Sequence, residues 1–123
     1  MAQSQIALAF GAGFAWIETA LGAAPEQVKA TAPTLFMVEI DNTANPLANS
    51  YFKAWFALAV NVTVGTTDPD MVIDCLPGKK LSIIITGAGL VFTTGLTVAC
   101  VTQGGTGGTT SPANPVACKV VYS

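Results

Sequence analysis

The stretch LTVACVTQGGTGGTTSPANPVACKVVY, residues 96–122, decides the fold. At each of its two ends, alternate residues fall on opposite faces, and one of those faces is apolar throughout. Alternation of this kind over four to eight residues is typical of a half-buried β-strand. We therefore expect strands over 95–102 and 116–122, paired as a hairpin that places Cys100 opposite Cys118.

The connection between these two strands carries four glycines, Gly104, Gly105, Gly107 and Gly108. A phosphate-binding P-loop needs GxxxxGK[ST] before a helix, whereas this segment has no lysine and leads into a proline-rich turn. The dinucleotide pattern GxGxxG is also unmet, because Thr110 stands where its last glycine is needed. We expect no cofactor here. The loop is either a flexible, solvated finger or a close-packed contact surface, and its four glycines are candidate interface residues.

From residue 34 onward, short β-rich runs alternate with clusters of turn residues. Besides the two strands above, the expected strands cover residues 34–41, 51–60, 71–75, 81–86 and 90–92. Their spacing, and their content of Thr, Val, Ile and aromatic residues, are typical of an all-β sandwich or barrel. The sequence therefore predicts an antiparallel β-sandwich over residues 34–123, of the jelly-roll or immunoglobulin-like type.

Residues 1–33 are expected to form an extended N-terminal arm or an edge segment of the sandwich. Their apolar residues fit both helical and strand spacing, but the glycines among them disfavour a helix. An apolar segment of this kind must be covered, either by its own domain or by a neighbouring subunit. The side chains that we expect at such an interface are Ile6, Phe10, Phe14, Trp16 and Ile17.

Charged residues are scarce: they make up 10% of the chain, against about 25% in an average protein. The sequence contains no histidine, which removes the usual general base near neutral pH and the commonest metal ligand. Its five lysines form no basic stripe, so we expect neither an enzyme nor a nucleic-acid-binding protein. With a net charge of −2, such a surface favours association, and we expect an oligomer or a component of a lattice.

The apolar N-terminal sequence differs from a targeting segment. It lacks the basic region of a secretion signal, and Glu18 interrupts its apolar run. Glycines also break the run below the length of a spanning helix. We expect a protein made in the cytoplasm that has no membrane partner.

The cysteines and one aspartate pair are weaker candidate sites. Cys75, Cys100 and Cys118 are odd in number and contain no CxxC pair, so reduced, buried thiols are expected. A bridge between Cys100 and Cys118 remains the alternative. Asp68 and Asp70 lie in a sequence typical of an ordinary turn, with calcium binding as their alternative.

Two further groups of side chains bear on function. Trp55 shares a face with Lys53 and is our best candidate for an interface anchor, because aromatic residues are enriched at interfaces.

Glycoside hydrolysis needs two carboxylates that flank the scissile bond. Glu39, Asp41 and Asp74 could supply them, but nothing in their spacing implies a cleft.

Five segments of the sequence resemble small virion structural proteins of tailed bacteriophages. They are VEIDNTANP, YFKAWFA, VTVGTTDPDMVIDCLPGKK, LVFTTGLTVACVT and GGTGGTTSPANPV. The resemblance covers roughly residues 35–122, and its motifs consist of turns and strands without a catalytic signature.

The resemblance implies a structural role in a virion. The most specific expectation is a capsid cement or decoration protein that bridges neighbouring copies of the major capsid protein. Because such proteins commonly form trimers or dimers, the resemblance also implies a homo-oligomer of one of these two kinds. A tail or fibre component is the related alternative. The alternative from another class is a secreted or surface β-sandwich binding module, such as an adhesin or a carbohydrate-binding domain.

Overall fold

The structure, a computed structural model, describes residues 3–7 and 13–123, without the side chains of residues 5–7. Within these ranges lie ten strands and one short 3-10 helix. They are β1 (Gln3–Ala7), β2 (Phe14–Leu21), β3 (Glu26–Lys29), β4 (Thr34–Asp41), β5 (Ser50–Trp55), η1 (Ala59–Asn61), β6 (Met71–Cys75), β7 (Lys80–Ile84), β8 (Leu90–Val91), β9 (Leu96–Val101) and β10 (Val116–Tyr122).

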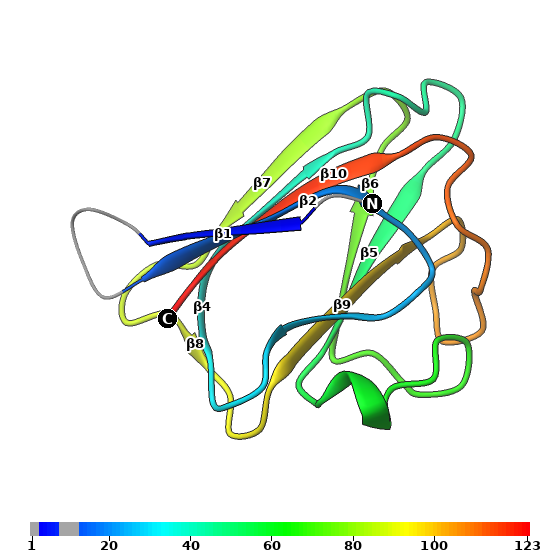
Figure 1. Cartoon of the computed structure of the whole chain (residues 1–123). Helices are drawn as coiled ribbons and strands as arrows, with labels where there is room; N and C mark the ends of the chain where they lie inside the picture. Colours follow the sequence, from blue (N-terminus) through cyan, green and yellow to red (C-terminus); the bar gives the residue numbers. More distant parts are fainter. Residues whose placement is uncertain (1–2, 8–12) are drawn as a thin grey trace.

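The strands form two antiparallel sheets that pack face to face (Figure 1). Sheet A has the order β1-β2-β10-β4-β7, with β8 also paired to β4, and sheet B has the order β3-β9-β5-β6. The expected all-β antiparallel sandwich is therefore confirmed. The strands over 34–41, 71–75 and 116–122 have the predicted bounds, whereas the run expected over 51–60 ends at Trp55.

The strand order is that of a jelly roll. Four antiparallel pairs are nested along the sequence: β5 with β6, β4 with β7, β3 with β9, and β2 with β10. Members of successive pairs fall alternately in sheet A and in sheet B, which is how two Greek keys make a jelly roll. An immunoglobulin fold orders its strands differently, so the jelly roll is the correct one of the two expected types.

The core lies between the sheets and is built from alternate residues of their strands. On sheet A, Val120 stands between Trp16 and Val38 of its two neighbouring strands, and all three are buried. On sheet B, Phe52 and Cys100 face the same interior. Because side chains alternate between the two faces of a strand, the intervening residues of these strands point away from the core.

The expected hairpin between the last two strands is wrong, because β9 lies in sheet B and β10 lies in sheet A. The glycine-rich connection therefore crosses from one sheet to the other. It runs beside the β2–β3 crossing, where Ala23 N donates to Ser111 Oγ at 2.9 Å. Cys100 and Cys118 both belong to the core, one from each sheet. Alternation alone does not distinguish paired strands from strands that face each other across a core.

For the N-terminal region, expected to be an extended arm or an edge segment, the structure places residues 14–29 in the sandwich, with β3 at the edge of sheet B. β2 lies inside sheet A, where it pairs with β1 on one side and with β10 on the other. β3 forms one edge of sheet B and pairs with β9. The reason is burial: Trp16 and Leu21 of β2 are each 2% exposed and fill the core.

A buried asparagine network joins three turns at one end of the sandwich. The amide nitrogen of Asn42 donates to the carbonyls of Ala48 and Leu76, at 2.9 and 3.1 Å. Its side-chain oxygen accepts hydrogen bonds from Ser50 Oγ and from the amide of Asn45. Asn45 in turn bonds the backbone of Asn114 in both directions: its amide donates to the Asn114 carbonyl, and Asn114 N donates to its side-chain oxygen. These bonds fix the turns 42–49, 76–79 and 112–115 together, and we call this part of the molecule the loop end.

We predict that Asn42→Ala lowers the free energy of unfolding by about 2–4 kcal/mol, because several buried backbone carbonyls lose their donor. Urea unfolding measures the change. The matched control is Asn61→Ala on η1, where the side chain is exposed, and it should stay within about 0.5 kcal/mol of the wild type. Equal effects of the two substitutions would show that the network does not hold the loop end.

Candidate functional site

The outer face of sheet B is covered by the protein's own loops. Tyr51, Lys53 and Trp55 alternate with core residues along β5 and therefore point outward. Lys53 is nevertheless 0% exposed and Trp55 is 1% exposed. Figure 1 shows η1 and the glycine-rich connection on the side of this sheet that faces away from sheet A.

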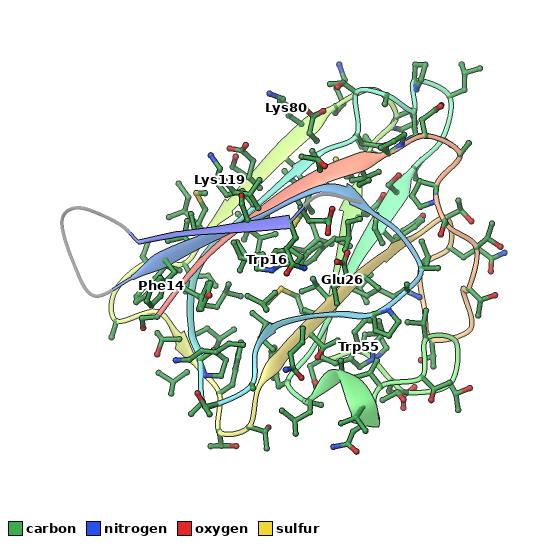
Figure 2. The ribbon with its side chains drawn as sticks, viewed as in Figure 1. Phe14, Trp16, Glu26, Trp55, Lys80 and Lys119 are labelled. Carbon is green, nitrogen blue, oxygen red and sulfur yellow. The ribbon has the colours of Figure 1, made fainter. Side chains whose placement is uncertain are left out.

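Trp55 cannot anchor an interface, because it is buried within its own chain (Figure 2). Its indole N–H donates to the carbonyl of Thr67 at 3.0 Å, and its ring packs in a cluster with Val62 and Ala99. The prediction is wrong because residues 57–70 fold back over the sheet, and the sequence gives no sign of that cover.

The glycine-rich connection is packed against sheet B, and Lys53 is its main polar contact. The ammonium group of Lys53 donates to the carbonyl of Gly105, and burial lowers the pKa of this lysine. Thr106 donates its hydroxyl to Asp68, and a Cβ at Gly104 would lie 3.1 Å from the ring of Tyr51. The segment therefore contacts its own sheet through these residues, although most of residues 103–115 are exposed. Its use as a contact surface for a neighbour stays a prediction.

The glycines of the connection differ in what they offer to a partner. Gly104, Gly105 and Gly107 are exposed, so they remain available as interface residues. Gly108 is buried, and a Cβ there would lie 2.8 Å from the carbonyl of Gln103. Gly108 is therefore a packing residue.

The outer face of sheet A is only partly covered by the chain itself. Ser82 and Ile84 are exposed, most of the other outward residues are partly buried, and Ala15 is 7% exposed. Cross-strand register places its residues in rows, of which one is Ile17–Lys119–Glu39–Ser82 and the next is Ala15–Val121–Met37–Ile84. The second row is apolar across four strands, and Ile84 at its end is 70% exposed. In Figure 2, Lys119 and Lys80 project from this side, away from sheet B. We call these two rows the open face.

The N-terminal interface candidates are divided by the fold. Ile17 is partly buried on the open face, and Phe14 is 39% exposed, with its ring centroid 5.7 Å from that of Tyr122. Trp16 is a core residue and cannot contact a partner. The backbone of Ile6 pairs with that of Ala15, and Phe10 lies outside the described residues.

A pair of glutamates links the two sheets, and the candidate sites expected from the sequence did not include it. Glu18 of sheet A is 0% exposed, and one of its oxygens accepts the backbone N–H of Ala20 at 3.0 Å. The other oxygen of Glu18 and Oε2 of Glu26 in sheet B are both buried and have no hydrogen-bond partner. Glu26 also accepts a hydrogen bond from the amide of Gln3, at 3.1 Å. Figure 2 shows Glu26 between the two sheets.

The carboxyl groups of the two glutamates are close enough to interact, and their charged forms repel each other. Burial, together with the adjacent carboxyl group and negative charge of Glu18, raises the pKa of Glu26 to about 7. One proton shared between two close carboxyl groups avoids the repulsion of two buried charges. Each glutamate occupies an inward position of its strand, and that position is the signal from which the pair could have been anticipated.

The remaining carboxylates are dispersed. Asp68 accepts from Thr106, Asp70 from the backbone N–H of Phe56, and Asp74 from the amide of Asn49. Glu39 and Asp41 lie on the outer side of sheet A, whereas Asp74 lies on sheet B, so these three do not form one site. In the described part of the chain, no group of three or more His, Cys, Asp or Glu could hold a metal ion.

All three cysteines are free and buried. Burial raises the pKa of Cys100 to about 12 and raises that of Cys118 well above its usual value. The pKa of Cys75 is raised for the same reason. Thiols of this kind are poor nucleophiles, because the thiolate is the reactive form.

Comparisons with known proteins add little to the description above. No protein-family model matches the chain, and no curated protein matches it. Among solved structures, the crystal structure of Escherichia coli ribosomal oxygenase YcfD is similar with a TM-score of 0.36 and 11% sequence identity. The match covers 90% of this chain and 23% of that chain, and a likeness this weak carries no argument. Over residues 3–7 and 13–123, no helix is long and apolar enough to cross a bilayer.

We predict that the glutamate pair makes the protein more stable at pH 5 than at pH 8. The folded state binds the Glu26 proton more tightly than the unfolded state does, so the pair's stabilisation is complete below pH 4.5 and is lost as the pH rises through about 7. After a discount for solvent screening we expect about 1–2 kcal/mol, or about 4–8 °C in Tm. No histidine titrates in this window to obscure the effect.

Thermal melts at the two pH values measure this difference. Glu26→Gln should remove most of it, because glutamine cannot be deprotonated. Asp74→Asn, an exposed change on β6, is the matched control and should retain it. A wild-type Tm that does not fall between pH 5 and pH 8 would contradict the shared proton.

Proposed function

We propose that this chain is a structural protein of a bacteriophage virion. In the specific form of the proposal it is a capsid cement or decoration protein that bridges neighbouring copies of the major capsid protein. It acts by binding alone, without catalysis, a cofactor, nucleic acid or a membrane. Its localisation is then the assembled virion.

The observation that carries the proposal is the construction of the loop end. Three of the segments that resemble virion proteins, DNTANP, LPGKK and SPANPV, meet there through the network of Asn42 and Asn45. The turns that this network holds present Leu47 and Leu76, which are 95% and 57% exposed. A fixed turn that displays leucine is prepared for binding, because little conformational entropy remains to be lost.

The loop end has the properties that a shell contact needs. Burying one exposed leucine contributes roughly 1.5–3 kcal/mol, so two leucines per copy give a weak contact that depends on few charges. A protein that binds the shell in many copies gains from such contacts through avidity. The jelly roll is consistent with this role, since viral capsid domains use it, although function is decided by sites and not by folds.

A carbohydrate-binding module is the second candidate, because lectin domains also use the jelly roll. Sugar binding of this kind uses exposed aromatic rings. Among the described aromatic side chains, Phe14 alone is in the exposed class. The leucines of the loop end therefore favour a protein partner over a sugar.

The proposal is tested on particles. Mass spectrometry of purified virions should detect the chain, and particles that lack it should lose their contents at a lower temperature. Adding the purified protein back should restore the wild-type temperature. Absence of the chain from intact virions would overturn the proposal.

The contact itself is tested by co-sedimentation with particles that lack the chain. The double variant Leu47→Asp, Leu76→Asp should bind at least about tenfold more weakly, because the apolar contact then contains two charges. Val60→Asp on η1 is the matched control, since Val60 is 84% exposed and lies over sheet B, and it should bind like the wild type. Wild-type binding by the double variant would exclude the loop end as the shell contact.

A further inference from the structure

We propose that the open face is the interface of a symmetric homodimer, in which two copies pack sheet A against sheet A. The two-fold axis runs parallel to β10 and β4, midway between them. The inference goes beyond the proposed function, because it concerns the free protein and is tested without any particle.

The two sheets differ in how far loops of the same chain cover their outer faces. The outer side chains Lys53, Trp55 and Ala99 of sheet B are at most 1% exposed, because loops of the same chain cover them. On sheet A the central residues Met37 and Val121 of the apolar row are only partly buried, and Ile84 is exposed. An apolar row that continues across four strands is what a packed sheet face requires.

The charge pattern of the open face is complementary to itself. Lys119 and Glu39 are direct cross-strand neighbours at the centre of the face. Neither is in the ion pairs of the described residues, where Lys80 and Asp41 are joined at 3.7 Å. Glu39 accepts a hydrogen bond from Ser82 Oγ at 3.4 Å. The centre of the face therefore carries one charge of each sign, and neither charge is held in an ion pair of the described residues.

The proposed axis brings opposite charges together. Rotation about it places β10 of one copy over β4 of the other, so Lys119 lies over Glu39 of the second copy, and Glu39 over its Lys119. The same rotation places Val121 over Met37 and Ile84 over Ala15 of the second copy. A two-fold axis running across the strands would instead stack Lys119 on Lys119, which like charges disfavour.

The geometry of the face fits an aligned sheet packing. Two stacked sheets lie about 10 Å apart, with their strands within about 30° of each other. The side chains of the two rows can fill the space between the sheets. The central strands β2, β10, β4 and β7 are symmetric about the axis, so each outward row meets its own copy. Because the face is only partly apolar and carries charges at its centre, we expect a weak dimer, in the micromolar range.

Sedimentation velocity over about 1–200 µM tests the proposal, with thermal melts to establish that each variant is folded. The wild type should pass from monomer to dimer in this range. Lys119→Glu and Glu39→Lys should each be monomeric throughout, because each creates like charges at both symmetry-related contacts. The double variant Lys119→Glu, Glu39→Lys should dimerise again, since the swap restores both pairs.

A separate pair of variants tests the apolar row. Ile84→Asp should weaken the dimer at least about tenfold. Val72→Asp should not, because Val72 is 42% exposed but lies on β6, at the edge of sheet B. A wild type that stays monomeric at 200 µM, or a charge swap that does not restore the dimer, would overturn the proposal. Neither result would bear on binding at the loop end.

Discussion

The structure depends on one strand pairing above all: β10 lies between β2 and β4 at the centre of sheet A. Its inward residues Val116, Cys118, Val120 and Tyr122 are each at most 3% exposed, and they fill the middle of the core. Because β2 lies near one end of the chain and β10 near the other, sheet A is complete only when both ends have met. Pairings of such long sequence separation make folding slow, since loop closure must precede the contacts that reward it.

The outer faces of the two sheets differ: one is covered by loops of the same chain, and the other is not. Sheet B is covered by loops that hold Trp55 and the ammonium group of Lys53 out of water. Sheet A leaves its outer face partly exposed, with an apolar row beside a central pair of opposite charges. The loop end is a third kind of surface, in which buried asparagines fix turns that display two leucines. The two proposals thus assign the open face to a second copy of the chain and the loop end to a different partner.

Much of the fold could be predicted from the sequence, because strand alternation and turn chemistry are local properties. The bounds of β4, β6 and β10 follow from alternation and were predicted correctly. Partners across the core are not local: alternation showed that Cys100 and Cys118 point inward, but not that their strands belong to different sheets. The same reason explains the errors at Trp16 and Trp55, whose burial depends on distant strands and loops. The glutamate pair was missed because it joins two sheets, although both residues occupy inward positions of their strands.

The burial of the three thiols determines how the folded protein reacts with oxidants. A thiol whose pKa is about 12, as at Cys100, is ionised to only about one part in 10⁵ at neutral pH. Disulfide exchange and oxidation both begin from the thiolate, so the folded chain is nearly inert to oxidants that cannot enter its core. The folded protein should therefore keep its three thiols in the same covalent form in both reducing and oxidising surroundings.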